Sequence, residues 1–219
     1  MPHFAKHPIF NDFINSLVNG FQSCTIRHIY RALVTQSDKF DVNELWEYVL
    51  HHPKHGYIKG APLILLDFVG ACVDHRVKGS TPLMFAAQNG DREVIERLIL
   101  DHDADYRLST DGAHDRNVLY WANLHDHTLL KKKAADYRSQ YSGSTYPITI
   151  TVELTRDMSM ANFVNDCIRT KLEYDLEDIN NEIHVVKNEL EEVNRKNKEL
   201  ENTISGFNDV INEIRVANV

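Results

Sequence analysis

Residues 172–214 carry an apolar residue at nearly every third or fourth position, and this heptad spacing constrains the fold more than any other feature. Twelve of the thirteen core sites are apolar. One core position holds Leu176, Ile183, Leu190, Asn197, Ile204 and Ile211, and the other holds Leu172, Ile179, Val186, Val193, Leu200, Phe207 and Ile214. Because a helix with one narrow apolar stripe is not stable alone in water, the pattern predicts a C-terminal coiled coil over residues 159–219.

The polar exception, Asn197, favours a parallel and in-register pair of identical chains, because a buried amide is best satisfied by another amide at the same height. In such a pair, Glu182 would face Lys187 of the other chain, and Lys196 would face Glu201. Several β-branched residues at the second core position fit a dimer less well. We therefore expect a homo-oligomer, with a parallel dimer favoured and a trimer as the alternative.

Upstream of the heptads, the apolar residues recur at helical spacing and predict helices over residues 10–18, 26–33, 45–49 and 62–69. Residues 41–43 offer a cap for the third helix, Pro53 ends it, and Pro62 fits the first turn of the fourth.

Residues 78–105 predict a compact pair of helices. Thr81 can cap a helix whose first turn accommodates Pro82, and Gly90 can supply the positive φ that ends it. Two consecutive alanines leave room for a neighbouring helix. The return helix would bury its apolar residues, which are Val94, Ile95, Leu98 and Ile99.

This stretch resembles the ankyrin repeat, in which a Thr-Pro-Leu segment, two alanines, a glycine turn, a pair of apolar residues and a closing Ala-Asp follow in order. The matching residues are Thr81, Pro82, Leu83, Ala86, Ala87, Gly90, Leu98, Ile99, Ala104 and Asp105. Met84 replaces the usual His, and Asp103 stands where the pattern has Gly, in a connection that is one residue longer. An irregular loop is expected there.

A weaker copy follows at residues 117–123, in which Leu119 lies 36 residues after Leu83. Asp126 takes the glycine position, and a short basic return helix is expected at residues 128–133. Because an array normally needs about three units to bury its faces, residues 1–75 must stack on these repeats, either as divergent repeats or as an N-terminal cap.

The resemblance implies binding of a protein partner through the loop tips and the concave face. Carried over position by position, that surface comprises Lys78, Ser80, Gln88, Asn89, His114, Arg116, Trp121 and His125. For Trp121 and Phe85, ordinary packing between repeats is the alternative.

Residues 136–158 change character. They contain a linker-like Ser-Gly-Ser-Thr segment and then an alternation at residues 146–154 that is typical of one short strand. The fold class expected is therefore mainly α: an irregular ankyrin-type array at residues 76–135, a strand-like linker, and the long coiled-coil helix.

The net charge of -8 argues against nucleic acid or an anionic membrane as the main partner, and no apolar run is long enough to cross a membrane. The three cysteines are widely spaced, and the N-terminal residues lack the apolar stretch of a secretory signal, so we expect a cytoplasmic protein.

The sequence lacks the common nucleophile, phosphate-binding and zinc-protease motifs, so we expect no enzymatic activity and no cofactor. Cys72 is expected to be a core residue. A hydrolase or metal enzyme built on Cys72, His75 and residues 51–55 is one alternative.

The function that these features favour is a protein-binding adaptor that self-associates through its coiled coil. A second alternative is that the coiled coil engages a helix of another protein. The architecture also resembles that of effectors which intracellular bacteria inject into host cells, where the host cytoplasm would be the location.

Overall fold

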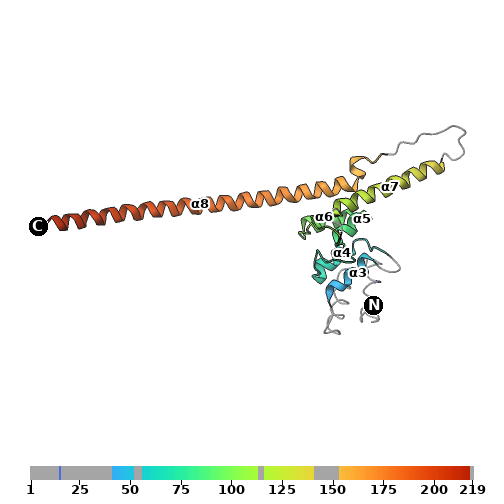
Figure 1. Cartoon of the computed structure of the whole chain (residues 1–219), viewed down its shortest axis with the longest axis horizontal. Helices are drawn as coiled ribbons and strands as arrows, with labels where there is room; N and C mark the ends of the chain where they lie inside the picture. The colour runs from blue at the N-terminus through green and yellow to red at the C-terminus, as the bar shows by residue number, and fades with distance from the viewer. Residues whose placement is uncertain (1–14, 16–40, 52–55, 113–115, 141–152, 218–219) are drawn as a thin grey trace. The chain divides into compact units, whose positions relative to one another are not determined.

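A computed structural model describes residue 15 and residues 41–51, 56–112, 116–140 and 153–217. The helix predicted at 26–33, all of the helix predicted at 10–18 except residue 15, and most of the strand-like segment at 146–154 lie outside the described residues. The chain divides into unit 1, Met1–Lys171, and unit 2, Leu172–Val219. The described residues are mainly helical, as predicted (Figure 1). None of the described helices combines the length and apolar character that a membrane crossing requires.

The predicted helix at 45–49 is confirmed as α3 (Leu45–Leu50), preceded by the short 3-10 helix η2 (Val42–Glu44). Asp41 caps this start, since its side chain accepts the backbone N–H of Asn43 at 2.9 Å. Trp46 is fully buried, and its indole N–H donates to the carbonyl of Cys72 at 3.0 Å. These contacts hold the segment after residue 70 against α3.

The predicted helix at 62–69 is also confirmed, but in two parts. α4 (Ala61–Ile64) continues into the π-helical stretch η3 (Leu65–Val69). Gly60 and Gly70 bound this helix, and both adopt the left-handed conformation. Asp91 fixes its start, because its carboxylate accepts the N–H of Gly60 at 2.9 Å and the hydroxyl of Tyr57 at 3.0 Å.

The central helix pair consists of α5 (Pro82–Asn89) and α6 (Arg92–Leu100). Thr81 caps α5, and Gly90 ends it with φ = 71°, as the sequence predicts. α5 packs against α3, α6 and α7, while α6 packs against α4. The loop after α6 is irregular, with Asp103 at φ = 53° in the left-handed region that the repeat pattern reserves for Gly.

The prediction of a short return helix at 128–133 is wrong. α7 (Val118–Gln140) is one continuous helix that runs through Asp126 (Figure 1). The expected domain boundary at residue 135 therefore falls inside a helix. No turn forms at Asp126 because this position holds Asp, which does not stop the helix as the left-handed Gly90 stops α5.

The place beside α6 is taken instead by the first turns of α8 (Met160–Ala217), which follow the short 3-10 helix η4 (Arg156–Met158). Met160, Val164 and Cys167 are buried in one core with residues of α5, α6 and α7. This burial raises the pKa of the Cys167 thiol to about 11. A second core lies around α3 and α4 and contains Leu45, Trp46, Val49 and Leu65.

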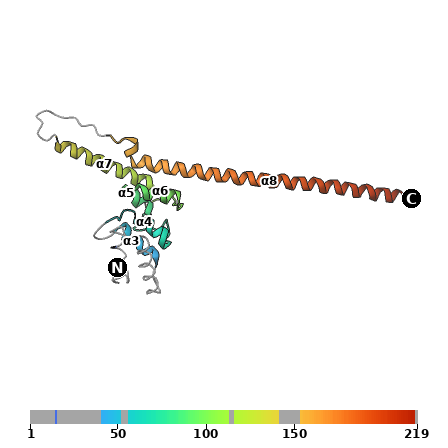
Figure 2. The ribbon, with the colours of Figure 1, turned by 180° about the vertical axis from the view of Figure 1, so that it is seen from behind.

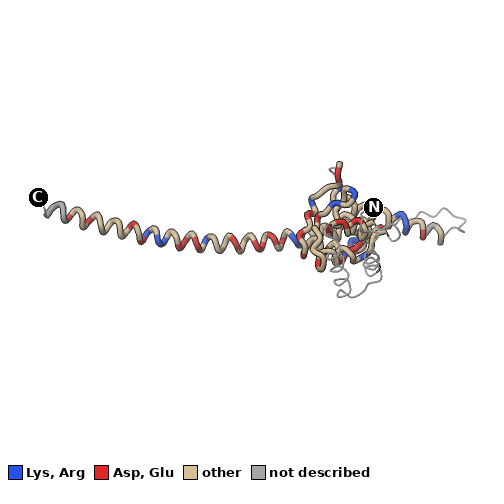
Figure 3. The backbone as a smooth tube through the Cα atoms, turned by 90° about the horizontal axis from the view of Figure 1, so that it is seen from below, with Lys and Arg blue, Asp and Glu red and all other residues tan. Residues whose placement is uncertain are grey.

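Unit 2 contains the remainder of α8, which stays helical through Gly206. Eleven apolar residues of the heptad stripe between Leu172 and Ile211 are 45–66% exposed. Asp and Glu recur along this part of the helix, as Figure 3 shows. Neighbouring turns are tied by local ion pairs, such as Arg195 with Glu192 at 2.7 Å and with Glu199 at 2.6 Å.

Candidate functional site

A tight hairpin places Lys78 at the surface. Val77 and Ser80 exchange backbone hydrogen bonds of 2.9 and 3.0 Å, and the two residues between them have positive φ, 51° at Lys78 and 81° at Gly79. Positive φ at both central positions is typical of a type I′ turn. The turn leaves the Lys78 side chain exposed and Ser80 half-buried.

Arg76 ties this hairpin to the next loop. Its guanidinium donates to the carbonyls of Gly79 at 3.0 Å and Ser109 at 2.7 Å, and it lies 3.1 Å from the Asp111 carboxylate. The backbone N–H of Asp111 also donates to Gly79. The hairpin is therefore held from one side, while its other side faces α3.

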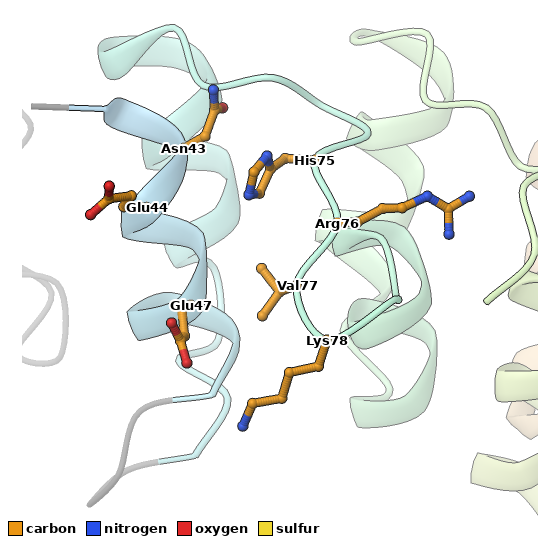
Figure 4. A pocket seen from close by; sticks show the side chains of 7 residues that line it. All are labelled: Asn43, Glu44, Glu47, His75, Arg76, Val77 and Lys78. Carbon is orange, nitrogen blue, oxygen red and sulfur yellow. The ribbon is translucent and has the colours of Figure 1, made fainter. Parts of the chain in front are cut away.

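Between the hairpin and α3 lies a pocket of about 310 Å³. Its lining consists of Asn43, Glu44, Glu47, His75, Arg76, Val77 and Lys78 (Figure 4). In Figure 4 the His75 ring points toward η2 and α3, whereas Arg76 points to the opposite side. The walls are held together by Asn43, whose side-chain oxygen accepts the N–H of Cys72 at 2.8 Å.

The pocket carries opposite charges on its two walls. Glu47 and Glu44 stand on the helical wall, although the Glu44 side chain points away from the hairpin in Figure 4, and Lys78 stands on the hairpin wall. Among the described residues, no ion pair joins Lys78 to Glu47 or to another carboxylate. The pocket lining thus combines acidic and basic side chains.

The sequence analysis named Lys78 as a partner-binding residue and His75 only for the alternative enzyme site, and it missed Asn43, Glu44, Glu47 and Arg76 as pocket residues. Asn43, Glu44 and Glu47 belong to a helix with no recognisable repeat motif. The apolar residues of this helix carried a usable signal of a repeat. Its buried residues are separated by one constant interval from the corresponding buried residues of α5, namely Trp46 from Leu83, Val49 from Ala86, and Leu50 from Ala87.

A second group of predicted residues gathers at the start of α7 and just before it. The Arg116 guanidinium lies 5.5 Å from the centre of the Tyr120 ring, and that ring meets Trp121 edge to face at 5.5 Å. Tyr120 is 38% exposed, whereas Trp121 is half-buried. Tyr120 is therefore the more accessible aromatic anchor of the two.

The remaining predicted residues lie around Gly90, at the far end of α5 from Lys78. His125 lies so close to Gly90 that an added Cβ would be 2.5 Å from its Nε2 atom. Gln88 is exposed, and the side-chain NH₂ group of Asn89 donates a hydrogen bond to the carbonyl of Phe85 at 2.8 Å. The predicted residues thus do not form one cluster, and His114 lies outside the described residues.

The structure also bears on the alternative site. Cys72 is exposed, so its prediction as a core residue is wrong; it lies in a loop, not on the buried face of a helix. Among the described residues, no group of three or more His, Cys, Asp or Glu side chains could hold a metal ion.

No curated protein and no solved structure matches the chain significantly. The ankyrin-repeat family model matches residues 78–111. This match begins at Lys78 within the hairpin and covers α5, α6 and the loop that follows. This part of the chain is therefore similar to an ankyrin repeat, and the similarity supports a role in protein–protein interaction.

Proposed function

We propose that this protein is a non-enzymatic adaptor, which binds a protein partner with unit 1 and joins copies of itself through α8. The observation that carries the proposal is the apolar stripe of unit 2. Its residues remain about half exposed in the single chain, and they recur over six heptads. Such a stripe favours association with another helix.

Apolar burial contributes more free energy to this association than the exposed ion pairs do. Each buried Leu or Ile contributes about 1.5–3 kcal/mol, whereas an exposed ion pair contributes about 0.2–1 kcal/mol. The stripe therefore supplies the affinity. Charges at the flanks, such as Lys196, select the arrangement; in the single chain Lys196 pairs with Glu192 of its own helix at 3.2 Å.

Two adjacent valines provide a matched test. Val186 belongs to the stripe and is 61% exposed, while Val185 lies off the stripe and is 55% exposed. Val186→Asp would place an unpaired carboxylate in the interface, at a cost of several kcal/mol. Val185→Asp would place its carboxylate in water, away from the interface.

Sedimentation equilibrium of the full chain at micromolar concentration should show an oligomer for the wild type and for Val185→Asp, and a monomer for Val186→Asp. A monomeric wild type would contradict the self-association. Equal loss in both variants would contradict the assignment of the stripe.

The partner site is proposed to be the surface formed by Lys78 and the pocket beside it. The support is the ankyrin repeat itself, together with the charged pocket walls. When two copies are joined, two weak sites act on one assembly and raise the avidity without a new contact.

Capture of partners from a lysate should identify proteins that are lost with Glu47→Lys and with Lys78→Glu. Lys132→Glu is a suitable control, because Lys132 is exposed on α7 away from the pocket lining. A partner set that is unchanged by both pocket variants would contradict this site.

A further inference from the structure

The first turns of α8 have the residue spacing of a return helix. In α6, two adjacent apolar pairs separated by two residues face the core, and the same spacing recurs at the start of α8. The two sets are Val94, Ile95, Leu98 and Ile99 in α6, and Phe163, Val164, Cys167 and Ile168 in α8. All eight belong to or pack against one core.

The contacts place these turns along α6 in the same direction. Near the start of both helices, the Arg92 guanidinium lies 4.8 Å from the centre of the Phe163 ring. Beyond the end of α6, Lys171 pairs with Asp103 at 2.5 Å. Successive return helices of a repeat array run in parallel, so α8 completes the helix pair that α7 begins.

Asp126 fixes this arrangement from α7. Its carboxylate accepts the N–H groups of Met160 at 2.7 Å and Ala161 at 3.0 Å, and the Ser159 hydroxyl at 2.7 Å. The first N–H groups of a helix have no partner within it, so Asp126 caps Met160 and Ala161, while Ser159 accepts the N–H of Asn162 at 3.2 Å.

The same helix then continues into unit 2 without interruption (Figure 2). Starting a helix is unfavourable by a factor of roughly 10³, whereas extending one is close to neutral per residue. When the first turns of α8 are packed in unit 1, they nucleate the helix of unit 2. In the same way, a unit 2 that is helical because it has associated with another copy favours helix in the preceding residues, back toward residue 160.

We infer that self-association through unit 2 stabilises unit 1, with the continuous helix α8 transmitting the effect. The inference rests on the self-association proposed above. The size of this stabilisation follows from mass action. A partner that binds only the folded state and is present at about 100 times its dissociation constant shifts the folding equilibrium by up to about 100-fold. The adaptor would then hold its partner-binding unit most firmly in the assembled state.

Two tryptophans make the effect measurable in the full chain. Trp46 and Trp121 are the only tryptophans, and both lie in unit 1. Their fluorescence therefore reports the unfolding of unit 1 while unit 2 contains no such signal. The midpoint of unit 1 unfolding in urea should rise as the protein concentration is increased across the range in which copies associate.

Glu173→Pro should interrupt α8 at the boundary between unit 1 and unit 2 and so uncouple their stabilities. Glu173→Ala is the control. Proline in a helix interior removes one hydrogen bond and clashes with the preceding turn. Five complete heptads of the stripe remain beyond it. The proline variant should still associate, but its unit 1 midpoint should no longer depend on concentration; the alanine variant should behave like the wild type.

The outcomes distinguish the two proposals. If the wild type does not associate by sedimentation equilibrium, the proposed function is contradicted. If it associates but the unit 1 midpoint stays constant, only the inference is overturned. A concentration-dependent midpoint in Glu173→Pro equally overturns it, because the effect would then not pass through the helix.

Discussion

Asp126 accepts the backbone N–H of Met160 at 2.7 Å although 34 residues separate them in the sequence. A helix cap normally comes from the residue just before the helix. Ser159 supplies that cap by accepting the N–H of Asn162 at 3.2 Å, and Asp126 adds a second cap from the side of another helix, so that its carboxylate joins α7 to α8.

We expect Asp126→Ala to destabilise unit 1 by about 2 kcal/mol, because a cap is lost and buried N–H groups are left without a partner. Urea unfolding followed by tryptophan fluorescence measures this. Asp136→Ala is the control, since Asp136 is exposed on the same helix. An unchanged Asp126→Ala midpoint would show that the cap does not contribute to stability.

The same carboxylate should make unit 1 sensitive to acid. Burial raises the pKa of Asp126, but the N–H groups of Met160 and Ala161 and the Ser159 hydroxyl outweigh it, so the pKa lies below its ordinary value of 3.8. The stabilisation is thus fully present above that value and is lost as the pH falls through the lower, folded pKa. Asp126→Asn should flatten this part of the stability–pH profile, and a profile identical to the wild type would argue against the assignment.

Gly90→Ala should be more harmful than Gly112→Ala. Both glycines have similar φ, 71° and 73°, but a Cβ at Gly90 would lie 2.5 Å from His125 while Gly112 faces open space. Both changes therefore carry about 1 kcal/mol of backbone strain, and Gly90→Ala adds a steric clash. Thermal unfolding of the two variants and of Gly90→Ala with His125→Ala tests this; the double variant should recover toward Gly112→Ala.

Asn197→Ile should tighten the association and weaken its specificity. A buried amide lowers the stability of a coiled coil and selects a single register, so isoleucine should strengthen binding but allow more than one assembly. Sedimentation equilibrium gives both results. Asn194→Ile, which lies off the stripe, is the control. Weaker association of Asn197→Ile would mean that this position does not lie in the interface.

Local backbone signals made several elements predictable. Thr81 and Gly90 mark the ends of α5 in the sequence, and both ends are confirmed. The heptads likewise indicated the continuous helix through unit 2, because periodicity is a property of neighbouring residues. Self-association stays a prediction.

Contacts between distant segments were not predictable in this way. Asp126 occupies a position where the repeat pattern has Gly, and a turn was expected because nothing nearby shows that its partner is the start of α8. The pocket was unpredictable for the same reason, because its walls are joined by a hydrogen bond between Asn43 and Cys72, which lie 29 residues apart in the sequence. For the docking of α8, the apolar spacing at residues 163–168 was an available signal, and it lies directly before the heptads.

The separation between α7 and its partner turns in α8 also affects the order of folding. α5 and α6 are joined by a tight turn and can pair from local contacts, whereas the start of α8 meets Asp126 of α7 across 34 residues of sequence. During synthesis, unit 1 therefore cannot be completed until the first turns of α8 have left the ribosome, and until then the apolar sides of α6 and α7 stay open to solvent or to a chaperone.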